Sequence, residues 1–327
     1  GASGVNAFGL WEYAYGRGFV IPRAPIHILA ESIRDGWNRG ARGYFAEVEP
    51  HWGFDAFKVW MLARMMWNPE LSVEDLENDF YGGYYGAAAG PMRLFFESCE
   101  NRWMTQSGAP RWLKYYGQED QALLFPPEVC EKLRRFLAEA KMVVAKSPVE
   151  LDRVARTERA FEVTEAFVRF DAMRRALQVI RADNLLAEGA LACAIANLEK
   201  GRDVFIEKTK AACAGKNPAM AAGNPDAFLR NDPVPRLLWL AGLRDSFGPC
   251  RILKAAGISK TRSQWWCIAF LFDSGSFRLS PNLVENGDFS QQANELKEPH
   301  FLYPKFGTLP AKWKLQAMPT ERGYVGL

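Results

Sequence analysis

Histidine is nearly absent from this chain of 327 residues, which contains it only at positions 27, 51 and 300. The six cysteines are scattered and form no Cys-x-x-Cys pair. Structural zinc sites and disulfide frameworks both require closer or more regular spacing of these residues. We therefore expect no metal site and no cofactor, and we expect the cysteines to be mostly buried thiols.

Long apolar runs and a strong net charge are also missing. No segment is apolar for long enough to cross a bilayer, so we expect no membrane span. The net charge of +3 is too small to indicate a nucleic-acid partner. The glycine-rich stretch 82–86 lacks both the lysine and the spacing of a phosphate-binding loop. The chain starts close to a predicted strand and carries no visible signal peptide, so we expect a fragment of a longer, processed protein.

Aromatic residues, in contrast, are abundant at 13% of the chain, with 11 tryptophans, 10 tyrosines and 22 phenylalanines. Flat rings suit sugar binding because they can stack on the apolar faces of pyranoses. A large hydrophobic core would need the same residues. Composition alone leaves both interpretations open.

Two short segments near the N-terminus have the period-two alternation of strands. Residues 7–16 place Trp11, Tyr13 and Tyr15 on one face and Glu12 on the other, where Glu12 would point into a helix layer and need a cationic partner. Residues 44–49 separate Tyr44, Ala46 and Val48 from Phe45, Glu47 and Glu49 in the same way. Helices are predicted at 26–39 and from about 54 to 67, which makes two consecutive βα units with parallel strands.

The remainder of the chain is predicted to be mostly helical. A short helix is expected to end near Tyr81, where Gly82 and Gly83 would break it, and long helices are expected over 87–104, 127–146 and 150–201. From Cys250 the pattern favours strands, with residues 265–272 as an example. We therefore divide the chain into 1–69, 70–245 and 246–327.

Parallel βα units bind ligands at the C-terminal ends of their strands. The side chains expected there are Glu47 and Glu49 as candidate catalytic carboxylates, and Tyr13, Tyr15, His51 and Trp52 as candidate substrate-binding residues. Trp11, deeper on the same face as the tyrosines, is a further candidate for substrate binding. Such a set is compatible with sugar binding, and glycoside cleavage is one reaction that needs an acid and a second carboxylate.

Glu47 and Glu49 are two residues apart on one strand, so their side chains should stand roughly 6–7 Å apart. That separation is nearer the inverting than the retaining geometry. However, two neighbours on one strand approach a sugar from the same side, which argues against a catalytic pair. Instead, one of the two carboxylates could bind sugar hydroxyls or assist another catalytic acid. Alternatively, the carboxylate could pair with an arginine at the strand ends. Trp11, which lies deepest, has core packing as its alternative role.

Several motifs resemble a known bacterial family. Glu47-Val48-Glu49 follows a short strand, Met66-Trp67-Asn68-Pro69 closes the next helix, and Val73-Glu74-Asp75-Leu76, Asp79-Phe80 and Tyr84-Tyr85-Gly86-Ala87-Ala88-Ala89 follow. This set resembles domain-of-unknown-function family 4838, which is similar to glycoside hydrolase family 163. The resemblance covers residues 7–105 well and the helical region to about 215 loosely.

The resemblance implies a fold, an activity and a location. The fold would be α/β and then mostly α: the last two βα units of a (β/α)8 barrel, a helical domain, and the start of a β-sandwich. Residues 282–289, 309–310 and 313 look like the first strands of a carbohydrate-binding jelly roll. The implied activity is hydrolysis of an oligosaccharide or glycan, with N-acetylglucosamine-containing glycans as one option. The implied location is secreted, periplasmic or at the cell surface. The alternative is a non-catalytic carbohydrate-binding or surface scaffold protein.

Overall fold

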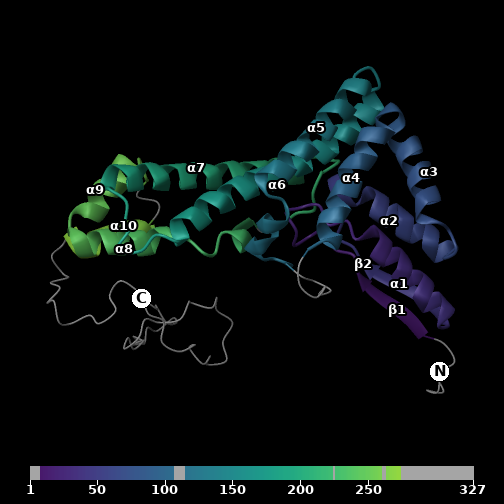
Figure 1. Cartoon of the computed structure of the whole chain (residues 1–327), viewed down its shortest axis with the longest axis horizontal. Helices are drawn as coiled ribbons and strands as arrows, with labels where there is room; N and C mark the ends of the chain where they lie inside the picture. The colour runs from purple at the N-terminus through teal and green to yellow at the C-terminus, as the bar shows by residue number, and fades with distance from the viewer. Residues whose placement is uncertain (1–7, 107–114, 224, 260–262, 274–327) are drawn as a thin grey trace. The chain divides into compact units, whose positions relative to one another are not determined.

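The computed structural model describes residues 8–106, 115–223, 225–259 and 263–273. Their fold is mostly helical, with one two-stranded parallel sheet (Figure 1). The chain divides into two compact units, one formed by described residues within 1–174 and 198–231, the other by those within 175–197 and 232–273. The division passes through two long helices and differs from the boundaries expected at 69 and 245, which stay predictions.

The first unit begins with a βαβ arrangement followed by a helical layer. The elements in chain order are β1 (Phe8–Tyr13), α1 (Ile26–Asn38), β2 (Ala41–Glu47), α2 (Trp52–Trp67), α3 (Val73–Tyr85), α4 (Ala89–Met104), α5 (Pro127–Val143), α6 (Pro148–Gln178) and α7 (Glu188–Cys213). Short 3₁₀ turns lie at Gly86–Ala88, Glu119–Leu124 and Pro225–Phe228. The two predicted strands and their parallel pairing are confirmed.

The register of the sheet aligns the two alternating patterns. Trp11 lies opposite Phe45, and Tyr13 lies opposite Glu47. The backbone ladder continues beyond the strands, since the amides of Ala14, Gly16 and Arg17 donate to the carbonyls of Glu47, Val48 and Glu49 at 2.9–3.0 Å. Residues 14–17 therefore follow the path of a strand, as predicted, although β1 itself ends at Tyr13.

Helix ends are set by local residues. The Ser72 hydroxyl accepts a hydrogen bond from the Asp75 amide at 3.0 Å and so caps α3, because serine is a preferred N-cap residue. Gly40, with φ of 99°, follows the C-cap of α1, where the left-handed conformation favours glycine. The expected break at Gly82 and Gly83 is wrong, because α3 continues to Tyr85 and ends at Gly86, with φ of 54°.

Aromatic packing explains why α3 continues through two glycines. Phe80 stacks on Tyr84 with ring centroids 4.9 Å apart, and Tyr81 stacks on Tyr85 at 6.1 Å. Tyr81 and Tyr85 are both almost fully buried. Burying these rings on both sides of the glycines outweighs a helix penalty of about 1 kcal/mol per glycine.

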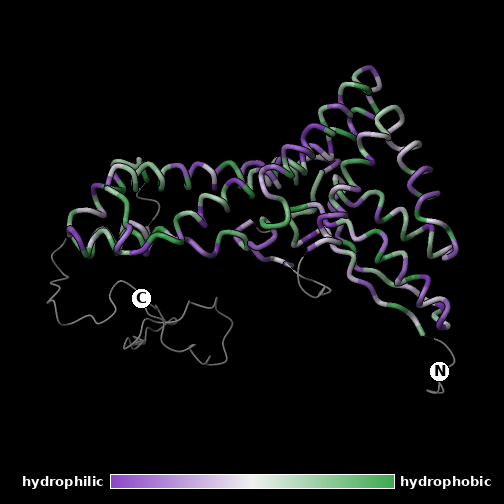
Figure 2. The backbone as a smooth tube through the Cα atoms, in the orientation of Figure 1, coloured by the Kyte–Doolittle hydropathy of each residue, from purple (hydrophilic) through white to green (hydrophobic). Residues whose placement is uncertain are grey.

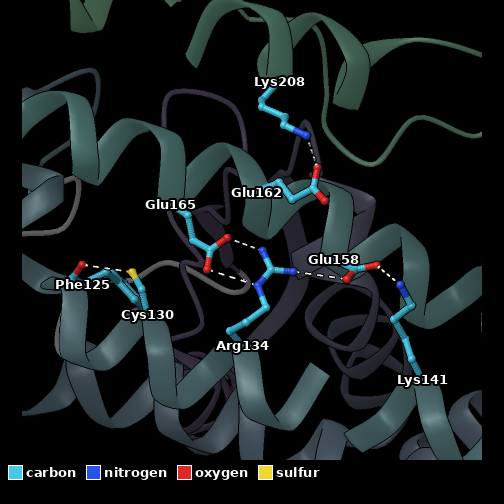
Figure 3. Close-up of polar contacts among 8 residues, drawn as sticks. All are labelled: Phe125, Cys130, Arg134, Lys141, Glu158, Glu162, Glu165 and Lys208. Carbon is cyan, nitrogen blue, oxygen red and sulfur yellow. Dashed lines mark hydrogen bonds and ion pairs between the residues drawn. The ribbon is translucent and has the colours of Figure 1, made fainter. Parts of the chain in front are cut away.

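Ion pairs join the outer helices of this unit (Figure 3). Arg134 of α5 donates to Glu165 and Glu158 of α6, and Lys141 of α5 pairs with Glu158 at 2.7 Å. Lys208 of α7 pairs with Glu162 of α6 at 2.9 Å. These three glutamates of α6 are thus half-buried links between helices. Figure 2 shows polar and apolar residues alternating along the helices, as amphipathic packing requires.

The second unit contains the end of α6, the start of α7, and α8 (Val234–Arg244), α9 (Gly248–Ala255) and α10 (Ser263–Asp273). The expected strand at residues 265–272 is wrong, because this segment is helical. Trp265, Ala269 and Phe272, spaced as on one helix face, are its buried side chains. The Trp265 indole donates to Asp232 at 2.7 Å. The expected jelly-roll motifs at 282–289 and 309–313 lie outside the described residues.

Candidate functional site

The open face of the sheet carries a row of aromatic rings. Trp11 lies 4.7 Å from Phe45 and 6.5 Å from Tyr13, measured between ring centroids. Tyr13 stacks on Tyr15 at 5.5 Å with an interplanar angle of 21°. Trp11 is 63% exposed and Phe45 is 53% exposed. The described part of the chain therefore does not bury Trp11 in a core, which was its alternative role.

Glu47 shares this face with the tyrosines. The Tyr15 hydroxyl donates a hydrogen bond to the Glu47 carboxylate. That bond is the main reason why the pKa of Tyr15 rises to about 12. The carboxylate is thus held in one orientation beside Tyr13 and Tyr15, where a ligand lying on the rings would meet it.

Glu49 has a different environment. It forms an exposed ion pair with Arg17 at 2.9 Å, the arrangement that the sequence had left open as an alternative. Its backbone has φ of 31°, in a region that non-glycine residues seldom occupy. The structure thus brings Glu47, but not Glu49, into contact with the aromatic row.

His51 lies beneath the site, in the interior. Its ring is 3% exposed, and both nitrogens are engaged. Nε2 lies 2.8 Å from the Phe19 carbonyl oxygen, and Nδ1 accepts a hydrogen bond from the Ala221 amide at 2.9 Å. This pattern requires a neutral ring with the proton on Nε2, and burial lowers the pKa of His51 accordingly. Its placement favours holding loops together over contact with a substrate.

Trp52 begins α2 directly after His51 and is 43% exposed. It does not belong to the ring row formed by Trp11, Tyr13 and Tyr15.

A buried charged cluster supports the strand ends from the helix side. Lys58 and Asp55, each 1% exposed, form an ion pair at 2.7 Å. Asp55 also accepts a hydrogen bond from the His51 amide at 2.7 Å. The guanidinium of Arg23 donates to the carbonyls of Tyr13 and Tyr15 at 3.2 Å, so it fixes the backbone that carries the tyrosines.

Glu12 lies near this cluster, on the buried face of β1, as its alternation predicted. Burial raises its pKa to about 7, while the Tyr13 amide and the charge of Arg23 act in the opposite direction. The expected cationic neighbour is therefore Arg23. Sequence reasoning had not identified Arg23, Asp55 or Lys58. The signal in the sequence was the Asp-x-x-Lys spacing in the first half of α2, where the neighbouring side chains are apolar.

No group of three or more histidine, cysteine, aspartate or glutamate side chains that could hold a metal ion occurs among the residues described. Within the same residues, no helix combines the length and the apolar character needed to cross a bilayer.

Residues 4–97 match a family described as Domain of unknown function (DUF4838), which covers the sheet, the candidate site and the helices to α4. No curated protein and no solved structure matches the chain.

Proposed function

We propose that this chain forms part of a glycoside hydrolase that acts on an oligosaccharide or glycan, with Glu47 as the carboxylate that contacts the sugar. The observation that carries the proposal is the position of Glu47, which is bonded to Tyr15 on the same exposed face as Trp11 and Tyr13. Rings provide stacking surfaces, and a fixed carboxylate provides the polar group that glycoside cleavage requires.

The fold proposal extends the observed sheet. Parallel sheets are normally covered on both faces and extend beyond two strands. Here α1 covers one face, since Leu10 of β1 packs against Gly36 of α1, while Trp11 and Phe45 stay exposed on the other. We propose that β1 and β2 are strands of a (β/α)8 barrel similar to that of glycoside hydrolase family 163. The β-sandwich and an extracytoplasmic location belong to the same proposal.

The alternative is a carbohydrate-binding or scaffold protein without catalysis. It is supported by the partners of the two carboxylates: Glu47 accepts from Tyr15, and Glu49 pairs with Arg17. Carboxylates engaged in this way can accept hydrogen bonds from sugar hydroxyls without taking part in bond cleavage.

The test is hydrolysis by the protein expressed from its complete natural reading frame. A panel of N-glycans and oligosaccharides would be incubated with the protein, and new reducing ends would be quantified. We expect Glu47→Gln to lower kcat by about 10²–10⁴-fold, in the range of general acid–base effects. Glu31→Gln, an exposed substitution on α1, is the matched control. Wild-type binding without cleavage would favour the non-catalytic alternative, and an unchanged kcat for Glu47→Gln would contradict the catalytic role.

A further inference from the structure

Tyr116 extends the aromatic row beyond the sheet. It lies in the segment between α4 and the turn at Glu119–Leu124, outside the family match. Its ring centroid is 5.7 Å from that of Tyr15 and 5.8 Å from that of Phe19. Tyr116 is 41% exposed. The rings of Trp11, Tyr13, Tyr15 and Tyr116 thus form one path that leads from the sheet onto the helical part of the same compact unit.

The segment that carries Tyr116 is anchored to the end of β1. The Gly117 amide donates to the Gly18 carbonyl at 2.8 Å. Gln121, fully buried, donates from its side-chain amide to the carbonyls of Gly18 and Tyr115 at 2.8 and 2.7 Å. Its side-chain oxygen accepts from the Val20 amide at 2.8 Å. One glutamine thus fixes both the segment with Tyr116 and the loop that follows Tyr15.

Backbone conformation and close packing show that this contact is specific. Gly18 has φ of 86°, and a Cβ added there would lie 2.3 Å from the Tyr116 ring. Tyr115 has φ of 68°, which is uncommon for a residue with a side chain. Such conformations persist where surrounding contacts determine them, and they often occur at ligand sites. A half-exposed tyrosine that is held in a fixed position in this way can offer its ring to a bound ligand.

The chemistry of the path favours a saccharide. Hydrogen-bonding groups lie beside these rings, namely the tyrosine hydroxyls and the Glu47 carboxylate that accepts from Tyr15. A ligand that matches it must offer apolar faces and hydroxyl groups at short intervals along an extended chain. We propose that Tyr116 is an additional sugar-stacking position, so that the site prefers longer oligosaccharides. This inference rests on the proposed function and names a residue that determines its length specificity.

The experiment measures how affinity depends on chain length. The complete protein would be titrated by calorimetry with β-linked oligosaccharides of one to six units, built from N-acetylglucosamine, glucose, mannose or xylose. We expect Tyr116→Ala to lower the affinity for the longest oligosaccharide that binds by about tenfold, which is the effect of losing one aromatic contact. The loss should be confined to chains long enough to reach beyond Tyr15. Tyr116→Phe, which keeps the ring, should retain most of the affinity.

Further variants separate positioning from misfolding. Gly18→Ala should displace the Tyr116 ring and so reproduce the length-dependent loss of affinity. Trp67, at the C-terminal end of α2, is 92% exposed, and Trp67→Ala should leave the affinity for every oligosaccharide unchanged. Thermal unfolding would be recorded for each protein. If Tyr116→Ala leaves long-chain affinity unchanged, or weakens all lengths equally, the inference is overturned. If Tyr13→Ala and Glu47→Gln also leave binding unchanged, or no sugar binds, the proposed function itself has failed.

Discussion

The Tyr15 hydroxyl donates a hydrogen bond to the Glu47 carboxylate, joining a residue two positions beyond β1 to the last residue of β2. The bond ties together the two strand ends at the candidate site. It also makes Tyr15 a reporter for Glu47, because tyrosine ionisation can be followed by absorbance.

The first prediction uses this reporter. Glu47→Gln should lower the pKa of Tyr15 from about 12 towards its ordinary value near 10, because the carboxylate no longer opposes formation of the tyrosinate. The raised value means that stability from this bond is present below pH 10 and is lost as pH rises through about 12. Absorbance titration near 295 nm, with Tyr15→Phe to identify the transition, measures the shift. An unshifted transition would show that the bond does not form in solution.

The second prediction concerns Glu12. Its pKa is raised from 4.5 to about 7, so its contribution to stability is most favourable at pH 4.5 and below, and is lost as pH rises through 7. Glu12→Gln mimics the protonated form and should stabilise the protein by about 1–3 kcal/mol at pH 8, with little effect at pH 4.5. Urea unfolding at both pH values tests this. Exposed Glu31→Gln is the control, and equal effects at the two pH values would contradict the assignment.

The third prediction concerns the buried pair of Asp55 and Lys58. Lys58→Met should destabilise the protein by about 3–5 kcal/mol, because Asp55 would keep a buried charge without its partner. Combining it with Asp55→Asn should cost clearly less than the sum of the two single changes. Denaturant unfolding of the four proteins in the cycle gives the coupling energy. Simple additivity would mean that the two side chains act independently.

The fourth prediction compares two glycines. A Cβ at Gly16 would lie 2.1 Å from the Asp55 carboxylate and 2.4 Å from the His51 amide nitrogen. The second of these is a backbone atom that cannot move aside, so Gly16→Ala should destabilise the protein by about 2–3 kcal/mol, in the upper part of the usual range for overpacking. A Cβ at Gly83, inside α3, would meet nothing within 4 Å apart from the backbone of its own helix, so Gly83→Ala should instead stabilise the protein by about 0.5–1 kcal/mol. We therefore expect the melting temperature to fall below that of wild type for Gly16→Ala and to rise above it for Gly83→Ala.

Local patterns predicted much of the first unit. Alternation placed Glu12 on the buried face and Tyr13, Tyr15 and Glu47 on the other, because side-chain direction in a strand depends only on position. The Ser72 cap was equally local. The segment 265–272 was misassigned because a short apolar run fits a strand or a buried helix equally well, and packing of Trp265 and Phe272 decides between them.

The environment of His51 could not have been predicted in the same way. Its two hydrogen-bond partners, Phe19 and Ala221, lie far from it in sequence in opposite directions. The position of Tyr116 against Tyr15 also depends on tertiary contacts, in this case through Gln121. The environment of His51 and the position of Tyr116 both depend on contacts between residues far apart in the sequence, which local periodicity does not encode.

The bond between His51 and the Ala221 amide has a consequence for how the protein is made. Gly53 likewise donates to the Ala219 carbonyl at 2.7 Å, and Thr164 donates to the carbonyl of Val20 at 2.8 Å. The supports of the N-terminal loops are therefore synthesised late, one within α6 and two after the end of α7. During translation, the strand ends at Tyr15 and Glu47 must wait for more than half of the chain before their surroundings are complete. A chain cut at the end of the family match, residue 97, would lack all three of these contacts.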